Sequence, residues 1–288
     1  MPTLQPTQSR GIGLIFPGQG SQSVGMGKAL AEACPGIRSV YDEASLVLGY
    51  DIAALCFDGP AEQLNLTEYT QPALLVSSLA ALHALQPLGV APIAVAGHSL
   101  GEYSALVAAG GMTYPEAVAI VQKRGRYMAE AVPPGTGLVA ALLGLTADVV
   151  KEVCREASSV GVVAAANFNS PGQIVIAGEK AAVERAIELA KAKGCKKAIV
   201  LPVSVPVHTP LMQKAADRLA GDLAAITWSD LKPIRRGLWL RPSLRSIAGG
   251  LTRGHCWRPR PWPARSCPHR LGLRPTRACP CARPNRPR

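Results

Sequence analysis

The segment with the clearest chemical potential is GHSLG at residues 97–101. It follows a short apolar run at residues 92–96, typical of a buried strand, and precedes a helix-forming stretch at residues 102–109. A strand, a G-x-S-x-G turn and a helix form the setting of a nucleophilic serine, because glycines permit the sharp turn and the helix directs free N–H groups toward an oxyanion. We therefore predict that Ser99 is a nucleophile; the alternative is a tight turn with a surface serine.

A serine hydroxyl needs a base that accepts its proton, and histidine is the usual one. Ahead of the final 50 or so residues the chain has three histidines, His83, His98 and His208. His83 lies in an apolar helix candidate at residues 71–85, where a packed or hydrogen-bonded histidine is expected. His98 adjoins the serine but points away from it if the chain makes a nucleophile elbow, the sharp strand-to-helix turn that exposes a catalytic serine. His208, in a loop before a helix, is the best candidate for the general base, although a lone loop histidine is more often solvated.

Arg124 is distinguished by its place on a helix predicted over residues 114–131. It lies on a face that is otherwise apolar, whereas Arg126 lies on a polar face with Glu130 as its i+4 partner. An inward guanidinium needs an anion. A buried protein carboxylate and a substrate carboxylate explain this position equally well.

The glycine-rich segment GQGSQ at residues 18–22 follows a first predicted strand at residues 13–16. It fits neither the dinucleotide-binding pattern nor the phosphate-loop pattern. A loop of this kind that approached the serine would instead supply a backbone N–H donor to the oxyanion.

The elements that must position these residues alternate between strands and helices. After a boundary at residues 133–135 (Pro-Pro-Gly), the order strand, helix, strand, strand, helix, strand extends to residue 202 and matches the ferredoxin-like motif. This predicts a small α/β unit inserted into a larger one, followed by a helix from Pro210 to about Ala225.

Charge is distributed unevenly along the 288 residues. The formal net charge is +12, but 13 arginines and no acidic residue follow residue 235, which leaves 18 basic against 19 acidic residues before it. We therefore expect the folded body, with a net charge of −1, to have no face for nucleic acid. No apolar run is long enough to span a membrane, and the first ten residues lack the apolar core of a secretory signal.

Five segments resemble the malonyl-CoA:acyl-carrier-protein transacylases and the related acyltransferase domains of polyketide synthases, over about residues 11–235. They occur in the family's order and at similar spacing: FPGQGSQ (16–22), GHSLGEYSAL (97–106), QKRGRYM (122–128), NFNSPGQIVIAG (167–178) and VSVPVHTPLM (203–212). The resemblance implies an α/β fold. An α/β-hydrolase-like core would comprise residues 1–131 and 205–235, and a ferredoxin-like subdomain would occupy residues 132–204.

The resemblance also implies a role for each matching residue. Ser99 would carry the malonyl group, His208 would act as general base and then as general acid, and Arg124 would bind the malonyl carboxylate. The backbone N–H groups of Gln19 and Leu100 would form the oxyanion hole. The reaction would move malonyl from malonyl-CoA to acyl carrier protein in fatty-acid biosynthesis, in the cytoplasm and without a metal or redox cofactor.

Three other functions compete with this one. A serine esterase or thioesterase shares the elbow but has no use for Arg124 on an apolar face. A nucleic-acid-binding protein would use the arginine-rich tail, which has no folded recognition motif. A metal site would draw on tail residues whose spacing fits no zinc pattern: Cys256, Cys267, Cys279, Cys281, His255 and His269.

The tail at residues 236–288 departs from the family. It is rich in Arg and Pro and lacks Lys, Asp and Glu, so we expect it to be disordered. The family supplies a Gln or Asn there whose backbone carbonyl holds the catalytic histidine, and we find no such segment. We expect the tail to be a shifted reading frame of GC-rich DNA, and the chain to be marginally stable and weakly active or inactive.

Overall fold

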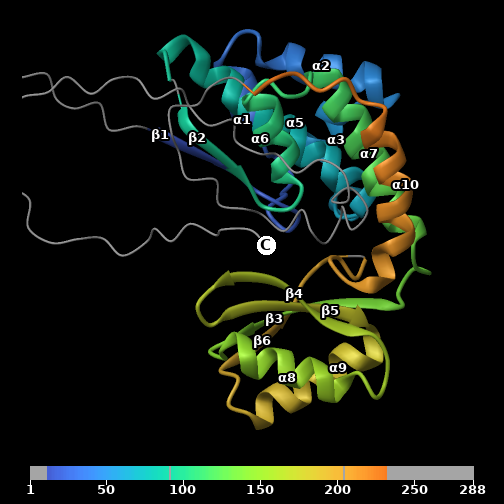
Figure 1. The fold of residues 1–288 in the computed structure, drawn as a ribbon. Helices are drawn as coiled ribbons and strands as arrows, with labels where there is room; N and C mark the ends of the chain where they lie inside the picture. Colours follow the sequence, from blue (N-terminus) through green and yellow to red (C-terminus); the bar gives the residue numbers. More distant parts are fainter. Residues whose placement is uncertain (1–11, 91, 204, 232–288) are drawn as a thin grey trace, which may run out of the picture. The chain divides into compact units, whose positions relative to one another are not determined.

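The computed structural model describes residues 12–90, 92–203 and 205–231 (Figure 1). The arginine-rich segment, the cysteines and histidines in it, and the hypothesis of a shifted reading frame lie outside the described residues.

Two parallel strands carry the serine and glycine-rich segments. β1 (Ile12–Phe16) pairs with β2 (Pro92–Gly97), with Phe16 opposite Gly97, so the chain leaves both strands at the same edge. α6 (Gly101–Ala108) begins directly beyond β2. The strand–turn–helix sequence predicted around Ser99 is therefore present.

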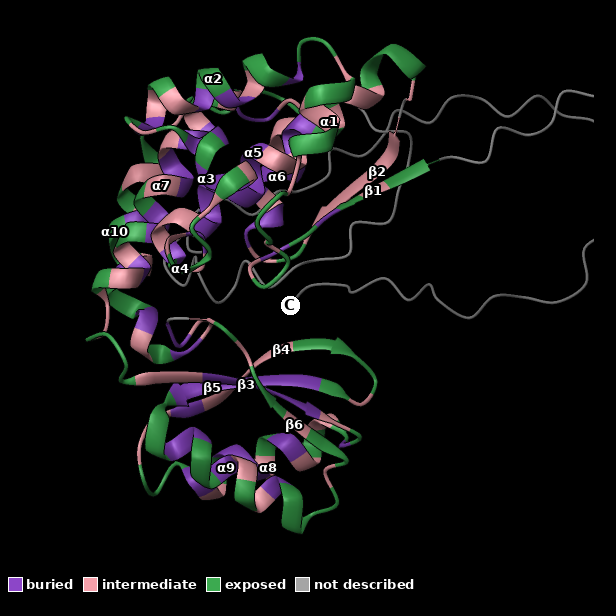
Figure 2. Cartoon of the chain, turned by 180° about the vertical axis from the view of Figure 1, so that it is seen from behind, coloured by how far each residue is buried: buried purple, intermediate pink, exposed green. Residues whose placement is uncertain are grey.

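Helices bury the first hydrophobic core around the long helix α5. The described helices before β3 are α1 (Lys28–Ala33), α2 (Ile37–Leu48), α3 (Ile52–Asp58), α4 (Ala61–Leu64), α5 (Thr67–Leu85), a 3-10 turn η1 (Gln86–Leu88), α6 and α7 (Tyr114–Glu130). Buried apolar residues from α2, α3, α5 and α7 form one cluster, which is drawn in purple in Figure 2. The short helices α3 and α4 were not predicted from the sequence.

The start of α5 differs from the prediction. The helix begins at Thr67 rather than at Gln71, and Pro72 lies inside it. The helical conformation is usually disfavoured for the residue that precedes a proline, here Gln71. Here Thr70, Gln71 and Pro72 are all buried, and the Thr70 hydroxyl donates to the carbonyl oxygen of Leu64 at 2.6 Å. Packing and this side-chain bond outweigh the local preference.

The helices α7 and α10 lie close to where the sequence predicted them. Thr113 and Glu116 form the capping box that begins α7. After residue 209 the chain makes a 3-10 turn, η2 (Pro210–Met212), and then α10 (Gln213–Ala224), which packs beside α7 in Figure 1.

A four-stranded antiparallel sheet follows α7. Its elements in chain order are β3 (Gly137–Leu143), α8 (Ala147–Ala157), β4 (Val163–Ser170), β5 (Gln173–Glu179), α9 (Lys180–Ala192) and β6 (Lys197–Val200). The strand order is β4-β5-β3-β6. This is the ferredoxin-like arrangement expected from the sequence.

Alternation along the strands gives this sheet two buried faces. Ala140 and Leu142 pack with residues of α8 and α9 in one cluster. Val139 and Ala141, which point the opposite way, pack in a second cluster that includes Val207. The residue next to His208 is therefore anchored on the sheet.

The α/β fold class is confirmed. Within the residues that the structure describes, no helix is both long and apolar enough to cross a membrane. The boundaries at residues 131, 204 and 235 remain predictions.

Candidate active site

Ser99 occupies a strained turn between β2 and α6. Its φ is 53°, in the left-handed region that side chains with a Cβ rarely adopt. The flanking glycines allow this turn through close packing rather than through positive φ. A Cβ at Gly97 would lie 2.0 Å from the backbone of Gly101, and one at Gly101 would lie 2.2 Å from the carbonyl oxygen of Phe16. Both positions of G-x-S-x-G therefore exclude any side chain.

The glycine-rich loop after β1 lies against this turn. A Cβ at Gly18 would lie 2.5 Å from the carbonyl oxygen of His98 and 2.6 Å from its Nδ1 atom. The side chain of Gln19 donates to the Thr67 hydroxyl at 2.9 Å, which anchors the loop to α5. The loop thus reaches the serine segment, as expected for a second backbone donor.

Leu100 lies at the start of α6 as its N-cap residue and is 1% exposed. Backbone N–H groups at the first turn of a helix have no acceptor within the helix. The N–H of Leu100 is therefore placed directly after Ser99 at the positive end of the helix dipole, where a negative charge is stabilised.

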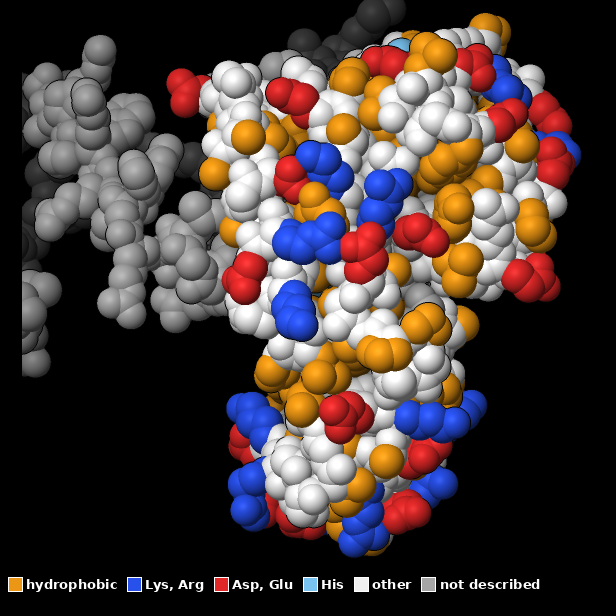
Figure 3. Space-filling view, turned by 90° about the vertical axis from the view of Figure 1, so that its right-hand side faces the viewer, with side chains coloured by type: hydrophobic (Ala, Val, Ile, Leu, Met, Phe, Trp, Pro, Cys, Tyr) orange, Lys and Arg blue, Asp and Glu red, His pale blue; other side chains and the backbone are white. Residues whose placement is uncertain are grey.

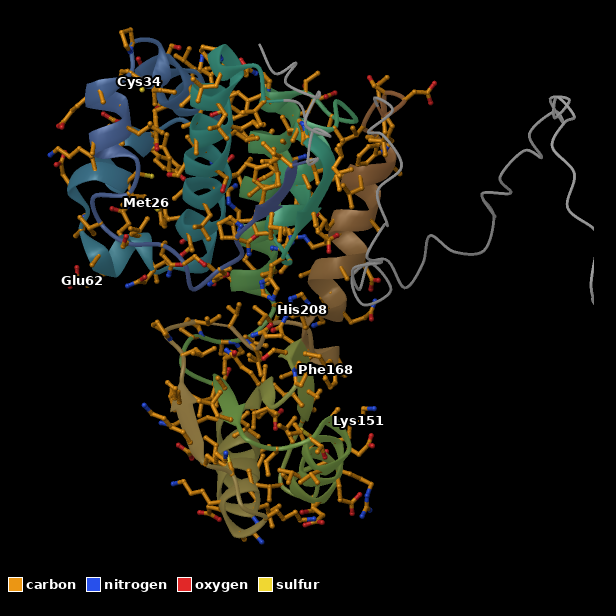
Figure 4. All side chains as sticks on the ribbon, turned by 90° about the vertical axis from the view of Figure 1, so that its left-hand side faces the viewer. Met26, Cys34, Glu62, Lys151, Phe168 and His208 are labelled. Atoms are coloured by element: carbon orange, nitrogen blue, oxygen red, sulfur yellow. The ribbon has the colours of Figure 1, made fainter. Side chains whose placement is uncertain are left out.

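His208 is the histidine that reaches the serine. Its Nε2 atom lies 3.0 Å from Ser99 Oγ, and its own φ is 57°. Burial, with the nearby charges of Arg124 and His98, lowers the pKa of His208 to about 4. The imidazole is therefore neutral near pH 7 and able to accept the proton of the serine hydroxyl. Figure 4 labels this side chain on the loop ahead of η2 and α10.

The other two histidines do not serve this role. His98 Nε2 lies 3.5 Å from the Nδ2 atom of Asn167 on β4, and the structure gives it no contact with Ser99. This agrees with the expectation that it points away from the serine. His83 is exposed near the end of α5, so the prediction of a packed histidine is wrong.

Arg124 is 2% exposed, and its guanidinium lies at the serine. Nη2 donates to Ser99 Oγ at 3.2 Å, and Nη1 donates to Gln71 Oε1 at 2.5 Å. Among the described residues, Nε has no hydrogen-bond partner and no carboxylate forms an ion pair with the group. Burial lowers the pKa of Arg124 from its usual value, although Tyr103 and Glu102 oppose this shift.

The neighbouring Arg126 is exposed, as its polar face predicts. Its expected partner is not observed, because Glu130 pairs instead with Arg218 of α10. The contrast between two arginines on one helix supports the distinction drawn from helical spacing.

A partly open hollow adjoins the Arg124 and His208 side chains. Apart from those two polar groups and a threonine, its wall is apolar and comes from α7, η2 and α10. The lining residues are Arg124, Met128, His208, Thr209, Met212, Ala215, Ala216 and Leu219. A small acyl chain with one charged end matches this lining.

Two residues of the site were missed from the sequence. Gln71 is buried in α5 and holds Arg124, and Glu102 lies in the first turn of α6. Burial raises the pKa of Glu102 to about 7, while Arg124 opposes the shift. A glutamine at the start of the apolar stretch 71–85 was a visible signal, but its partner lies 53 residues further along the chain.

Within the described part of the chain, no cluster of three or more His, Cys, Asp or Glu side chains has the arrangement of a metal site. Cys56 and Cys154 are buried and, like Cys34 and Cys195, form no disulfide.

Comparison with known proteins agrees with this geometry. Residues 14–239 match the family model described as acyl transferase domain. The malonyl CoA-acyl carrier protein transacylase of Escherichia coli strain K12 is 54% identical over 216 residues, which are 75% of this chain and 70% of that protein. The protein of the same name from Bacillus subtilis strain 168 is 49% identical over 220 residues, covering 76% of this chain and 69% of that protein.

Solved structures give the same result. The malonyl CoA-acyl carrier protein transacylase of Coxiella burnetii superposes with a TM-score of 0.75 at 47% identity, covering 77% of this chain and 71% of that one. A structure of a type II PKS acyl-carrier protein in complex with its malonyl-transacylase gives a TM-score of 0.73 at 50% identity, covering 75% and 71%. With its serine, histidine and arginine brought together on this fold, the chain belongs to the acyl transferase family of the malonyl CoA-acyl carrier protein transacylases.

Proposed function

We propose that this chain transfers a malonyl group from malonyl-CoA to the phosphopantetheine thiol of an acyl carrier protein, through a malonyl ester of Ser99. The observation that carries this proposal is the buried guanidinium of Arg124, which lies 3.2 Å from the nucleophile and has no carboxylate partner among the described residues. A buried cation beside a nucleophile selects an acyl group that brings its own anion.

The first half-reaction forms the ester. His208 Nε2 accepts the proton of the Ser99 hydroxyl as Oγ attacks the thioester carbonyl of malonyl-CoA. The N–H groups of Gln19 and Leu100 stabilise the resulting oxyanion. The C–S bond then breaks, and the leaving CoA sulfur takes the proton from His208.

The second half-reaction uses the same groups in reverse. His208 accepts the proton of the phosphopantetheine thiol, and the sulfur attacks the ester carbonyl. The bond between Ser99 Oγ and the acyl carbon breaks, and His208 returns the proton to Oγ. The thiol acceptor and the thiol leaving group are chemically alike, so no metal or redox cofactor is required.

Arg124 has two tasks in this scheme. Two of its nitrogens hold Gln71 and Ser99, and the remaining Nε is free of protein partners among the described residues. We infer that Gln71 keeps its hold on Nη1 and that the remaining donors of the guanidinium bind the malonyl carboxylate in a charge-assisted pair. The acyl group would lie in the hollow lined by α7 and α10, while CoA and the acyl carrier protein would stay outside it.

A serine esterase is the competing function. Hydrolysis needs a water that reaches the acyl ester, whereas a transferase must keep the ester until a thiol arrives. Among the described residues, no carboxylate contacts His208, whereas a Ser-His-Asp hydrolase has one that orients the histidine. We therefore favour transfer to a thiol, in the cytoplasm where malonyl-CoA and the carrier protein would both be available.

Transfer and hydrolysis are separated by one assay. The protein is incubated with malonyl-CoA in the presence and absence of holo acyl carrier protein, and mass spectrometry follows both the carrier and free malonate. We expect malonyl on the carrier and little free malonate. Rapid release of malonate without any carrier product would contradict the proposal.

A further inference from the structure

The amide side chain of Gln71 is the protein group that holds the guanidinium of Arg124. Gln71 lies in α5 and is 1% exposed. Its Oε1 atom accepts from Arg124 Nη1 at 2.5 Å, and its Nε2 atom donates to the sulfur of Met128 at 3.2 Å. Both of its polar ends are therefore used, and the orientation of the amide is fixed.

The chemical type of this residue matters as much as its position. A buried arginine is ordinarily neutralised by a carboxylate, since an unpaired buried charge is costly. Here the protein supplies an amide, which accepts a hydrogen bond but carries no charge. The guanidinium is thus held in place while its positive charge stays available.

We propose that Gln71 is a positioning residue that sets acyl specificity, because its neutral acceptor fixes Arg124 and leaves the charge of Arg124 for the carboxylate of the acyl group. This inference rests on the proposed function. It assigns to Gln71 the choice between a carboxylated acyl group and an uncharged one of similar size.

The consequence is that an isosteric acid should reverse the selection. In Gln71→Glu, a carboxylate of the same shape would pair with Arg124 inside the protein and repel an incoming malonyl carboxylate. An acetyl group has no carboxylate, so its transfer to Ser99 should not suffer. In Gln71→Met, the acceptor is removed without adding a charge, so Arg124 keeps its charge but loses its anchor.

The experiment measures the single-turnover rate of Ser99 acylation by malonyl-CoA and by acetyl-CoA, using intact-protein mass spectrometry on the full chain. We expect malonyl acylation to fall by roughly 10- to 100-fold in Gln71→Glu. This is the size expected when the malonyl carboxylate loses a hydrogen bond to the charged Arg124. The rate of malonyl acylation in Gln71→Met should lie between the rates of Gln71→Glu and the parent. Acetyl acylation should stay within about threefold of the parent in both variants.

The control is Gln122→Glu on α7, where the parent glutamine donates to the carbonyl oxygen of Leu48 away from the serine. This variant should leave the malonyl-to-acetyl ratio unchanged. A general folding defect would lower both acylations together and leave the malonyl-to-acetyl ratio unchanged. An unchanged ratio in Gln71→Glu would therefore overturn the inference. A parent protein that takes acetyl but no malonyl would instead contradict the proposed function itself.

Discussion

The Nε2 atom of His208 lies 3.0 Å from the Oγ atom of Ser99, and both residues have φ near +55°. Two non-glycine residues in the left-handed region at one contact are a cost that the surrounding fold must offset. At Ser99 the offset comes from the tight packing of Gly97 and Gly101, and at His208 from the apolar clusters on both sides of its loop. The contact between Ser99 and His208 is therefore built by the scaffold rather than by local preference.

This contact predicts the effect of removing the base. His208→Ala should slow acylation of Ser99 by roughly 10²- to 10⁴-fold, the usual contribution of a positioned acid–base group. The rate in the parent should rise as pH increases through about 4, where His208 loses its proton, and stay level toward pH 8. Stopped-time mass spectrometry across pH measures both. An unchanged single-turnover rate in the variant would exclude His208 as the base.

The two arginines of α7 form a matched pair for a test of substrate selection. Arg124→Ala should abolish malonyl acylation while keeping acetyl acylation, because only the malonyl group has a carboxylate for the guanidinium to bind. Arg126→Ala, an exposed site on the same helix, should change neither. Parallel assays with the two thioesters decide the matter, and equal loss of both activities in Arg124→Ala would indicate a structural role.

Glu102 and His208 should give opposite contributions to stability below pH 7. The folded-state pKa of Glu102 is raised from 4.5 to about 7, so the native state binds more protons and stability falls as pH rises through that window. The pKa of His208 is lowered from 6.5 to about 4, so the unfolded state binds more protons and stability rises with pH between those values.

Between about pH 4.5 and 6.5 these two contributions offset each other, each with a slope of at most about 1.4 kcal/mol per pH unit. Glu102→Gln should therefore make the melting temperature rise more steeply with pH in this window. His208→Ala should make it fall. Thermal melts at several pH values measure the slopes, and identical slopes in the parent and both variants would rule out the shifts.

Asp222 on α10 joins this helix to α7. It accepts from Lys123 Nζ at 2.6 Å and from the Tyr127 hydroxyl at 2.7 Å. On the side from which Figure 3 is viewed, basic and acidic side chains are interspersed and no patch of one sign forms. Partly exposed pairs of this kind contribute modestly one by one, and more when several share a partner.

Asp222→Ala should lower the free energy of unfolding by about 1–2 kcal/mol, because it removes two hydrogen bonds to a charged group. Glu152→Ala, which removes an exposed ion pair with Arg155 within α8, is the control and should have a smaller effect on the free energy of unfolding. Urea unfolding compares them. Equal effects of the two substitutions would show that Asp222 has no special role.

The sequence predicted most of the site because its signals are local. The turn around Ser99 and the place of Arg124 follow from spacing along one element, and the strand–helix order beyond residue 135 predicted the four-stranded sheet. Gln71 and Glu102 escaped because their roles depend on burial and on partners brought together by the fold. The start of α5 was misplaced since tertiary packing around Thr70 overrides the local effect of Pro72. The domain boundaries stay a proposal.

A malonyl ester on Ser99 is tested directly by peptide mass spectrometry after brief exposure to malonyl-CoA. We expect one added malonyl group on the peptide that contains Ser99 in the parent protein. We expect none in Ser99→Ala, and loss of the label from the parent once holo acyl carrier protein is added. Labelling that persists in Ser99→Ala, or that maps to another residue of the parent, would contradict it.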